Sequence, residues 1–175
     1  DLPLADCEQR WPSLVQYLRE TVKPQRATSN RAAYRERWWL HAERQTSLYQ
    51  AISGLDRVLA ISNISKHFAI AFCETDQIFD HNLTVFAFDT YAAFAILQSR
   101  VHDIWAEAFS STLENRRGYR LTDCFLTFPF PDGWKGRPEV ESAGASCHVH
   151  RDALIASGAA GLTAVYNRLH DPDDC

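Results

Sequence analysis

The sequence has no methionine, only seven glycines among its 175 residues, and no pair of cysteines in a CxxC arrangement. It also lacks any apolar run of the roughly 18 residues that a membrane span requires, and no signal peptide opens it. These absences argue against a zinc ribbon and a spanning helix, and they predict a cytoplasmic protein. Because the chain begins at Asp1 and contains no methionine, we expect it to be a piece of a longer polypeptide.

The motifs that carry much nucleotide and nucleophile chemistry are missing as well. There is no GxGxxG or GxxxxGK loop to cradle a phosphate, and no GxSxG elbow to present a nucleophilic serine. The sequence therefore predicts no complete active site and no cofactor bound to this chain.

The cysteines are odd in number and widely spaced, which is typical of reduced thiols rather than of a disulfide framework. They are Cys7, Cys73, Cys124, Cys147 and Cys175. Cys147, His148 and His150 form the one metal-like cluster, with His170 and Asp171 as candidates for further ligands. In a helix, however, positions two apart diverge around the axis, so His148 and His150 would not converge on one ion. We predict no metal site here, and we keep a metal-dependent enzyme as an alternative.

Residues 83–109 combine the clearest strand signal with the clearest helix signal. Apolar residues alternate from Leu83 to Ala87, and Asp89 or Thr90 then offers an N-cap at which the period changes from 2 to 3.6. A broad apolar face follows, and it predicts one long amphipathic helix over residues 90–109. The apolar face of such a helix must pack against another apolar surface, and a sheet can provide it.

Strands that can form this sheet precede the helix. Residues 57–64, 68–73 and 83–88 are apolar and β-branched or alternating, and their short connections predict an antiparallel meander. Residues 124–128 add a strand before Pro129 and Pro131 prevent further pairing. We therefore predict an α+β fold with an antiparallel sheet of about four strands, packed by the long helix.

Helical segments are expected on both sides of this core. One begins near Trp11 and ends at Lys23-Pro24, a second carries Tyr34 and Trp38, and a short one starts at Thr46 or Ser47. Residues 138–155 predict a C-terminal helix. The expected division is a domain over residues 1–134 and a small helical region over residues 135–175.

Charge is distributed unevenly along the chain. The net charge is −4, yet residues 19–66 hold nine basic and four acidic side chains, a local excess of +5. Such asymmetry indicates a side that faces a polyanion, although solvated helix faces are often equally rich in arginine. Four arginines are therefore candidates for contacts to a nucleic-acid backbone: Arg31, Arg35, Arg37 and Arg57.

Several segments together, in this order, resemble the C-terminal part of MmeI-like, type IIL restriction-modification proteins and the related DNA methyltransferases. They are Tyr34-Arg35-Glu36-Arg37-Trp38-Trp39, Asn63-Ile64-Ser65-Lys66-His67, Leu97-Gln98-Ser99-Arg100-Val101-His102 with Trp105, Asp123-Cys124-Phe125 leading to Thr127-Phe128-Pro129-Phe130-Pro131, and Tyr166-Asn167-Arg168-Leu169-His170-Asp171-Pro172. The resemblance runs over nearly all of the chain.

This resemblance implies a bacterial defence function. In that family a nuclease and an S-adenosylmethionine-dependent adenine-N6 methyltransferase precede a target recognition domain, which reads the sequence of double-stranded DNA, and a small helical region follows. The methyltransferase motifs are absent here, so this chain would be the recognition module without the catalyst. Its implied partners are DNA and the methyltransferase domain of the same polypeptide, with no membrane, and S-adenosylmethionine belongs to the parent enzyme.

The resemblance also implies where DNA bases are read, namely at three polar interruptions of apolar structure. The candidate residues are Ser62, Asn63, Ser65 and Lys66 in the first interruption, Asp80, His81 and Asn82 in the second, and Ser110, Ser111, Glu114, Arg116 and Arg117 in the loop after the long helix. Their side chains suit base edges, since Arg and Lys donate to guanine and Asn pairs with adenine. The main alternative is a structural domain whose basic flank docks on another part of the parent polypeptide.

Overall fold

The computed structural model describes residues 2–41, 44–113, 116–158 and 161–171, with the side chains of residues 111–117 outside this description. It divides into two compact units, Asp1–Thr46 and Ser47–Cys175. The first is helical, and the second combines helices with antiparallel sheet. The predicted α+β class is confirmed. The predicted boundary between residues 134 and 135 remains a prediction.

The first unit contains α1 (Leu4–Arg10), α2 (Pro12–Ala27) and α3 (Ala32–Glu36). The prediction that the helix ends at Lys23-Pro24 is wrong, because α2 runs on to Ala27. Pro24 removes one helical hydrogen bond, but Arg26 in the last turn donates to the carbonyls of Trp38 and Leu40 and fastens the helix end to the following segment. Trp38 itself is buried and follows α3 rather than belonging to it.

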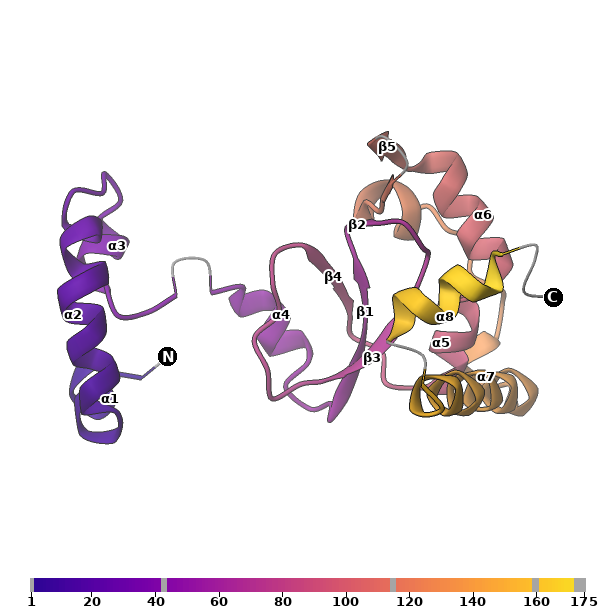
Figure 1. Ribbon diagram of the computed structural model, residues 1–175, viewed down its shortest axis with the longest axis horizontal. Coiled ribbons are helices and arrows are strands. Elements are labelled where there is room, and N and C mark those ends of the chain that lie inside the picture. Colours follow the sequence, from indigo (N-terminus) through magenta and orange to yellow (C-terminus); the bar gives the residue numbers. More distant parts are fainter. Residues whose placement is uncertain (1, 42–43, 114–115, 159–160, 172–175) are drawn as a thin grey trace. The chain divides into compact units, whose positions relative to one another are not determined.

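The sheet of the second unit has β1 (Arg57–Ser62) at its centre, between β3 (Ala71–Glu74) and β4 (Leu83–Phe86), with both pairings antiparallel (Figure 1). The predicted meander would have placed β3 in the middle, so that prediction is wrong. The physical reason is burial: β1 is apolar on both faces from Val58 to Ile61, and a strand covered on both faces belongs in the interior of a sheet.

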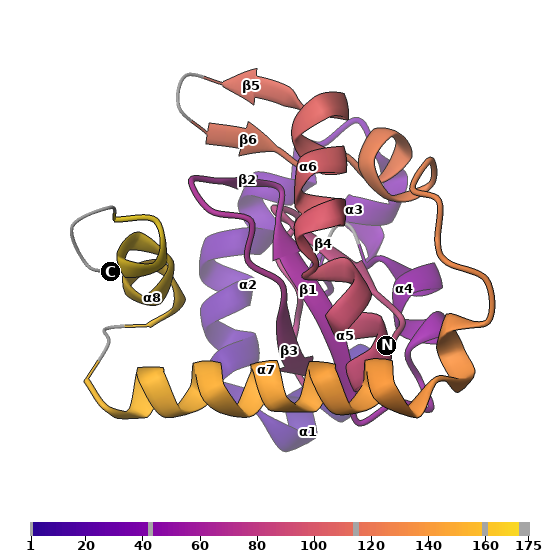
Figure 2. The same ribbon diagram turned by 90° about the vertical axis from the view of Figure 1, so that its right-hand side faces the viewer.

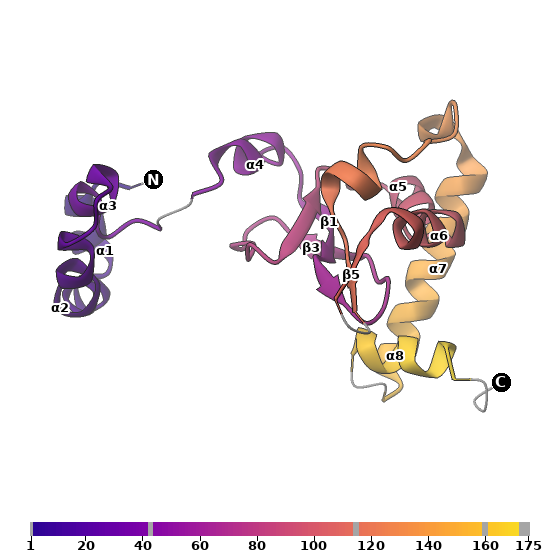
Figure 3. The same ribbon diagram turned by 90° about the horizontal axis from the view of Figure 1, so that it is seen from above.

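Each face of the sheet has its own core. On one face Leu59 and Ile61 pack with Phe86 and with Phe94 of α5. On the other, Val58 packs with Ile52 and Phe79. Ile52 follows α4 (Thr46–Ala51), which begins at Thr46 as predicted and lies on the side of the sheet opposite α5 and α7 (Figure 3).

The predicted helix over residues 90–109 is two helices, α5 (Tyr91–Leu97) and α6 (Arg100–Phe109). Thr90 caps α5 as expected, but the chain breaks at Gln98 and Ser99. The Gln98 side chain accepts a hydrogen bond from Ile70 N (2.7 Å) and donates to Phe68 O (3.0 Å). It thereby replaces sheet bonds for residues 68–70, which is why β3 begins only at Ala71.

A second, smaller sheet contains β2 (Ile64–Ser65), β6 (Arg116–Gly118) and β5 (Ser111–Leu113), in that order. The expected loop after the long helix is thus a hairpin. The predicted strand at residues 124–128 is wrong, since Leu121–Phe125 forms a π-helical turn in which Leu126 N donates to Leu121 O. Cys124, Phe125 and Phe128 all pack into one core cluster, which an alternating strand could not achieve.

The predicted C-terminal helix is confirmed as α7 (Pro138–Ala156), and it runs along α5 (Figure 2). The Glu141 carboxylate accepts hydrogen bonds from Tyr91 N and Ala92 N at the start of α5. Buried Arg151 donates to Ile70 O at 2.6 Å. The α7 helix is therefore part of the packing of this unit, and α8 (Leu162–Leu169) follows it.

Candidate nucleic-acid interface

The three polar segments implied by the resemblance meet at the end of β1. Asn63 N donates to Asn82 O at 2.7 Å, and Tyr119 N donates to Asn63 O at 2.8 Å. Beyond Asn63, β2 pairs with β6 (Figure 2), and their register places Ser65 opposite Arg117. Residues 62–66, residues 80–82 and the strands β5 and β6, far apart in the sequence, therefore lie next to one another.

The Asn63 side chain strengthens this junction. Its Nδ2 donates to His81 O at 3.1 Å, while its Oδ1 accepts from the Thr84 hydroxyl at 2.6 Å. Together with its two main-chain bonds, these contacts fix the orientation of the amide. Asn63 thus holds the segments together, whether or not it also contacts a base.

The second segment is a tight turn that leaves one ring exposed. Asp80 Oδ1 accepts from both the main-chain N and the side-chain Nδ2 of Asn82, each at 2.8 Å. The hydrogen bond from the Asn82 backbone is the main cause of a lowered Asp80 pKa. His81 has 82% of its side chain exposed and lies 3.5 Å from the Asp80 carboxylate. This arrangement presents to solvent an imidazole and a carboxylate, which together can donate and accept hydrogen bonds.

In the first segment the two serines are engaged locally and the lysine is engaged at long range. The Ser62 hydroxyl donates to Ile64 O, and the Ser65 hydroxyl accepts from His67 N. Lys66 Nζ donates to Asn167 Oδ1 of α8 at 2.8 Å. Base-edge readout by these side chains stays a prediction.

The hairpin itself is described at its backbone. Ser111, Arg116 and Arg117 lie in paired strands, but their side chains fall outside the description, and Glu114 lies outside the described residues. Ser110 ends α6 as its C-cap, and its N–H donates to Ala106 O. The hairpin therefore starts directly from a packed helix.

A buried pair of side chains anchors the end of the hairpin. His102 in α6 is fully buried; its Nδ1 donates to Leu97 O at 2.7 Å, and its Nε2 lies 3.2 Å from the Tyr119 hydroxyl. Burial lowers the pKa of His102 and raises that of Tyr119, so both side chains are neutral near pH 7. The Tyr119 hydroxyl then donates to the unprotonated Nε2. Nothing in the sequence pattern indicated this pair.

The four arginines predicted to contact a DNA backbone fall into two groups. Arg31, Arg35 and Arg37 are exposed in the first unit, where Arg31 donates to the Tyr34 hydroxyl and Arg35 to Ser29 O. Arg57 is the first residue of β1, and Ser62 is its last. The Arg57 guanidinium lies 3.9 Å from the centre of the Phe72 ring. Arg57 therefore packs against the sheet, and contact of any of the four arginines with a DNA backbone stays a prediction.

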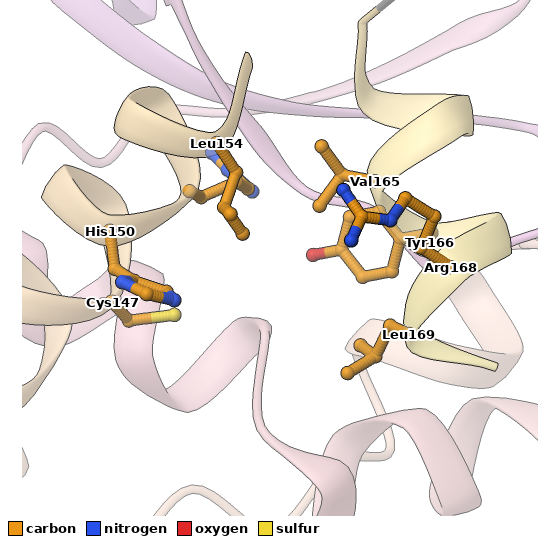
Figure 4. Close-up of a pocket in the computed structure, with 8 residues that line it drawn as sticks. Cys147, His150, Leu154, Val165, Tyr166, Arg168 and Leu169 are labelled. Carbon is orange, nitrogen blue, oxygen red and sulfur yellow. The ribbon is translucent and has the colours of Figure 1, made fainter. Parts of the chain in front are cut away.

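The Cys147 and His150 cluster lines a pocket of about 380 Å³ between α7 and α8. Figure 4 shows both side chains on α7, facing Val165, Tyr166 and Leu169 across the opening. Within the described residues, no group of three His, Cys, Asp or Glu side chains is placed to hold a metal ion. The lining is largely apolar, in contrast to the polar end of β1.

Comparison with known proteins identifies the fold family. A family model described as MmeI, target recognition domain, matches residues 6–132. The chain belongs to this family. A target recognition domain is the DNA-sequence recognition module of a restriction-modification enzyme and is not its catalyst, so the polar junction at the end of β1 lies in a DNA-recognition module.

The other comparisons found no match to a curated protein or to a solved structure. No helix within the described ranges has the length and apolarity needed to cross a membrane. The matched residues end before α7 and α8, which therefore extend the target recognition domain on its C-terminal side.

Proposed function

We propose that this target recognition domain selects the DNA sequence at which a type II, MmeI-like methyltransferase acts. The catalytic domain would lie elsewhere in the same cytoplasmic polypeptide and would methylate adenine at N6 with S-adenosylmethionine. The observation that carries the proposal is the junction at Asn63, which brings three polar segments to one end of a rigid sheet in a chain of this family.

The geometry suits base readout because the site is both polar and held in place. Buried β1 supports residues 62–66, the Asn63 joint supports residues 80–82, and the His102 and Tyr119 pair supports the hairpin. Side chains on such a support keep a fixed position relative to the DNA bases. Each good bidentate base contact then discriminates between bases by about 1–3 kcal/mol. Ser62, Ser65, His81 and the hairpin residues are therefore the proposed readers.

The alternative, docking on another part of the parent polypeptide, is favoured by two exposed apolar surfaces. Trp11, Leu14 and Tyr17 are about half exposed at the N-cap and in the first turns of α2, and Val101 and Ile104 are similarly exposed on α6. A recognition module must also contact its catalytic domain, so these surfaces fit a role beside DNA reading. Docking alone would leave the polar junction without a function.

The hairpin provides the sharpest test of base reading. Substituting Glu114→Gln together with Arg116→Gln in the full-length parent enzyme should change or relax one base of the methylated motif, as mapped by methylome sequencing of cells that express it. A carboxylate beside a guanidinium orients the latter toward a base, which is why the two are changed together. The matched control is Glu139→Gln with Arg137→Gln at the start of α7. An unchanged motif that is methylated less efficiently would assign the hairpin to the DNA backbone.

We also propose that this chain alone binds no S-adenosylmethionine, because no phosphate- or adenosine-cradling motif is present in its sequence. Calorimetric titration of the 175-residue chain should give no saturable heat. Saturable binding would contradict the proposal and would place part of the cofactor site in this chain.

A further inference from the structure

A polar cleft of about 690 Å³ lies beside the proposed reading surface, between α8 and the residues that follow β2. Its lining includes Lys66, His67, Arg100, Asp103 and His170. The cleft thus joins the first polar segment, the start of α6 and the C-terminal helix. Of these three parts of the cleft, the C-terminal helix is the one outside the residues matched by the family model.

Asn167 of α8 contacts two of the residues that line this cleft, Lys66 and His67. Its Oδ1 accepts from Lys66 Nζ and lies at the same distance, 2.8 Å, from His67 Nε2. Because an amide oxygen only accepts, the His67 proton resides on Nε2. The His67 ring is buried and stacks on His170, with 5.5 Å between ring centres and 6° between planes. These contacts hold Lys66 toward α8.

The charges around the cleft favour an anion of low charge. Lys66 and Arg100 carry two positive charges, and Asp103, which forms an ion pair with Arg100, offsets one of them. Arg100 is also the first residue of the ten-residue helix α6, whose amino end carries a partial positive charge. A phosphodiester has a single negative charge and accepts hydrogen bonds from lysine, arginine and imidazole N–H groups.

We propose that this cleft binds one phosphate of the DNA backbone, with Lys66 and Arg100 as its ligands and Asn167 as the positioning residue for Lys66. Helix α8 is then part of the DNA-binding surface, and Lys66 contacts the backbone rather than a base. The inference rests on the proposed function, because it needs DNA on the adjoining surface.

The test uses the 175-residue chain and a pool of random-sequence DNA duplexes, with enriched sequences identified and affinities for one of them measured from about 50 to 200 mM salt. Lys66→Gln should make the negative slope of log K against log salt shallower by about 0.9 and leave the enriched sequence unchanged. The control Lys135→Gln removes the same charge just before the amino end of α7. The 19-residue helix α7 is about 28 Å long, and only its other end leads to α8. The slope for Lys135→Gln should equal that of the unchanged chain.

A double-mutant cycle tests the role of Asn167. Asn167→Ala should weaken DNA binding severalfold in the original chain but leave binding by the Lys66→Gln variant unchanged, because Asn167 acts through Lys66. An equal loss in both backgrounds would make Asn167 merely structural and overturn its assignment.

The outcomes separate the inference from the proposed function. Failure of the unchanged chain to bind and enrich any sequence would overturn the proposed function. Sequence-specific binding with an unchanged slope for Lys66→Gln, or with a different base enriched, would overturn only the phosphate site.

Discussion

His102 illustrates how one buried side chain couples the helix α6 to the recognition surface. Its pKa is lowered by burial, so the folded chain binds fewer protons near pH 6 than the unfolded chain does. The free energy of unfolding must then rise with pH across this range and fall on acidification. Protonation would also replace the acceptor that the Tyr119 hydroxyl needs with a second donor.

We predict that acidification from about pH 7 to about pH 5.5 lowers the free energy of unfolding, and that His102→Gln reduces this dependence. The pKa of His148 is also lowered by burial, so His148→Gln is the comparison that separates the two histidines. Urea denaturation at several pH values provides the measurement. The same pH dependence in His102→Gln as in the original chain would contradict the assignment.

Gly144 is the residue that permits α7 to approach α5. A Cβ atom at this position would lie 2.0 Å from the carbonyl oxygen of Tyr91, which is backbone and cannot rotate away. We expect Gly144→Ala to destabilise the chain by about 1–3 kcal/mol, measured by urea or thermal denaturation. Gly136→Ala is the matched control, because a Cβ there meets nothing within 4 Å. Equal stability of the two variants would show that the helices can separate at little cost.

At the level of elements, the contact between α5 and α7 allows the predicted domain boundary between residues 134 and 135 to be tested. A chain that ends at residue 134 loses the Glu141 cap on α5 and the Arg151 bond to Ile70. Because this truncation uncovers the buried face of α5, we predict that it abolishes cooperative unfolding. Circular dichroism during denaturation measures this. A chain that ends at residue 157 retains α7 and should unfold cooperatively. Cooperative unfolding of the shorter chain would establish residues 135–175 as a separate region.

Elements with a local signal were predictable, and those set by distant contacts were not. The strand at Leu83 and the cap at Thr90 follow from period and side-chain chemistry. The break at Gln98 depends on backbone groups 28 and 30 residues away, and periodicity does not encode such a partner. The central place of β1 likewise depends on what covers its second face.

At the scale of the molecule, the two compact units allow the roles of the basic residues to be tested separately. Substituting Arg31, Arg35 and Arg37 by glutamine should reduce the salt slope of DNA binding by about 0.9 for each phosphate that these arginines neutralise. Salt titration of DNA affinity measures this, and circular dichroism of the variant checks that the helices of the first unit persist. An unchanged slope would leave these arginines with a structural role at the surface of that unit, such as the bonds to Tyr34 and Ser29.

For the candidate site, the segments that meet were predictable, but the contacts between them were not. Polar interruptions at residues 62–66, 80–82 and 110–117 are visible in the sequence, and family resemblance joined them. The bonds from Asn63 to two distant segments, and from Asn167 to Lys66, have no local signature because their partners are 18 to 101 residues away. Such pairings are set by the folded chain as a whole.

The three segments are joined at Asn63 by peptide groups of Asn82 and Tyr119, and peptide groups are the same whatever side chain they carry. Exchange of other side chains around this point therefore leaves these backbone hydrogen bonds in place. Under the proposed function, specificity can then change one position at a time while these backbone hydrogen bonds are kept. The same arrangement offers an engineer a fixed backbone on which residues at 62, 65, 81 and the hairpin can be randomised together, provided Asn63, Thr84, His102 and Tyr119 are kept.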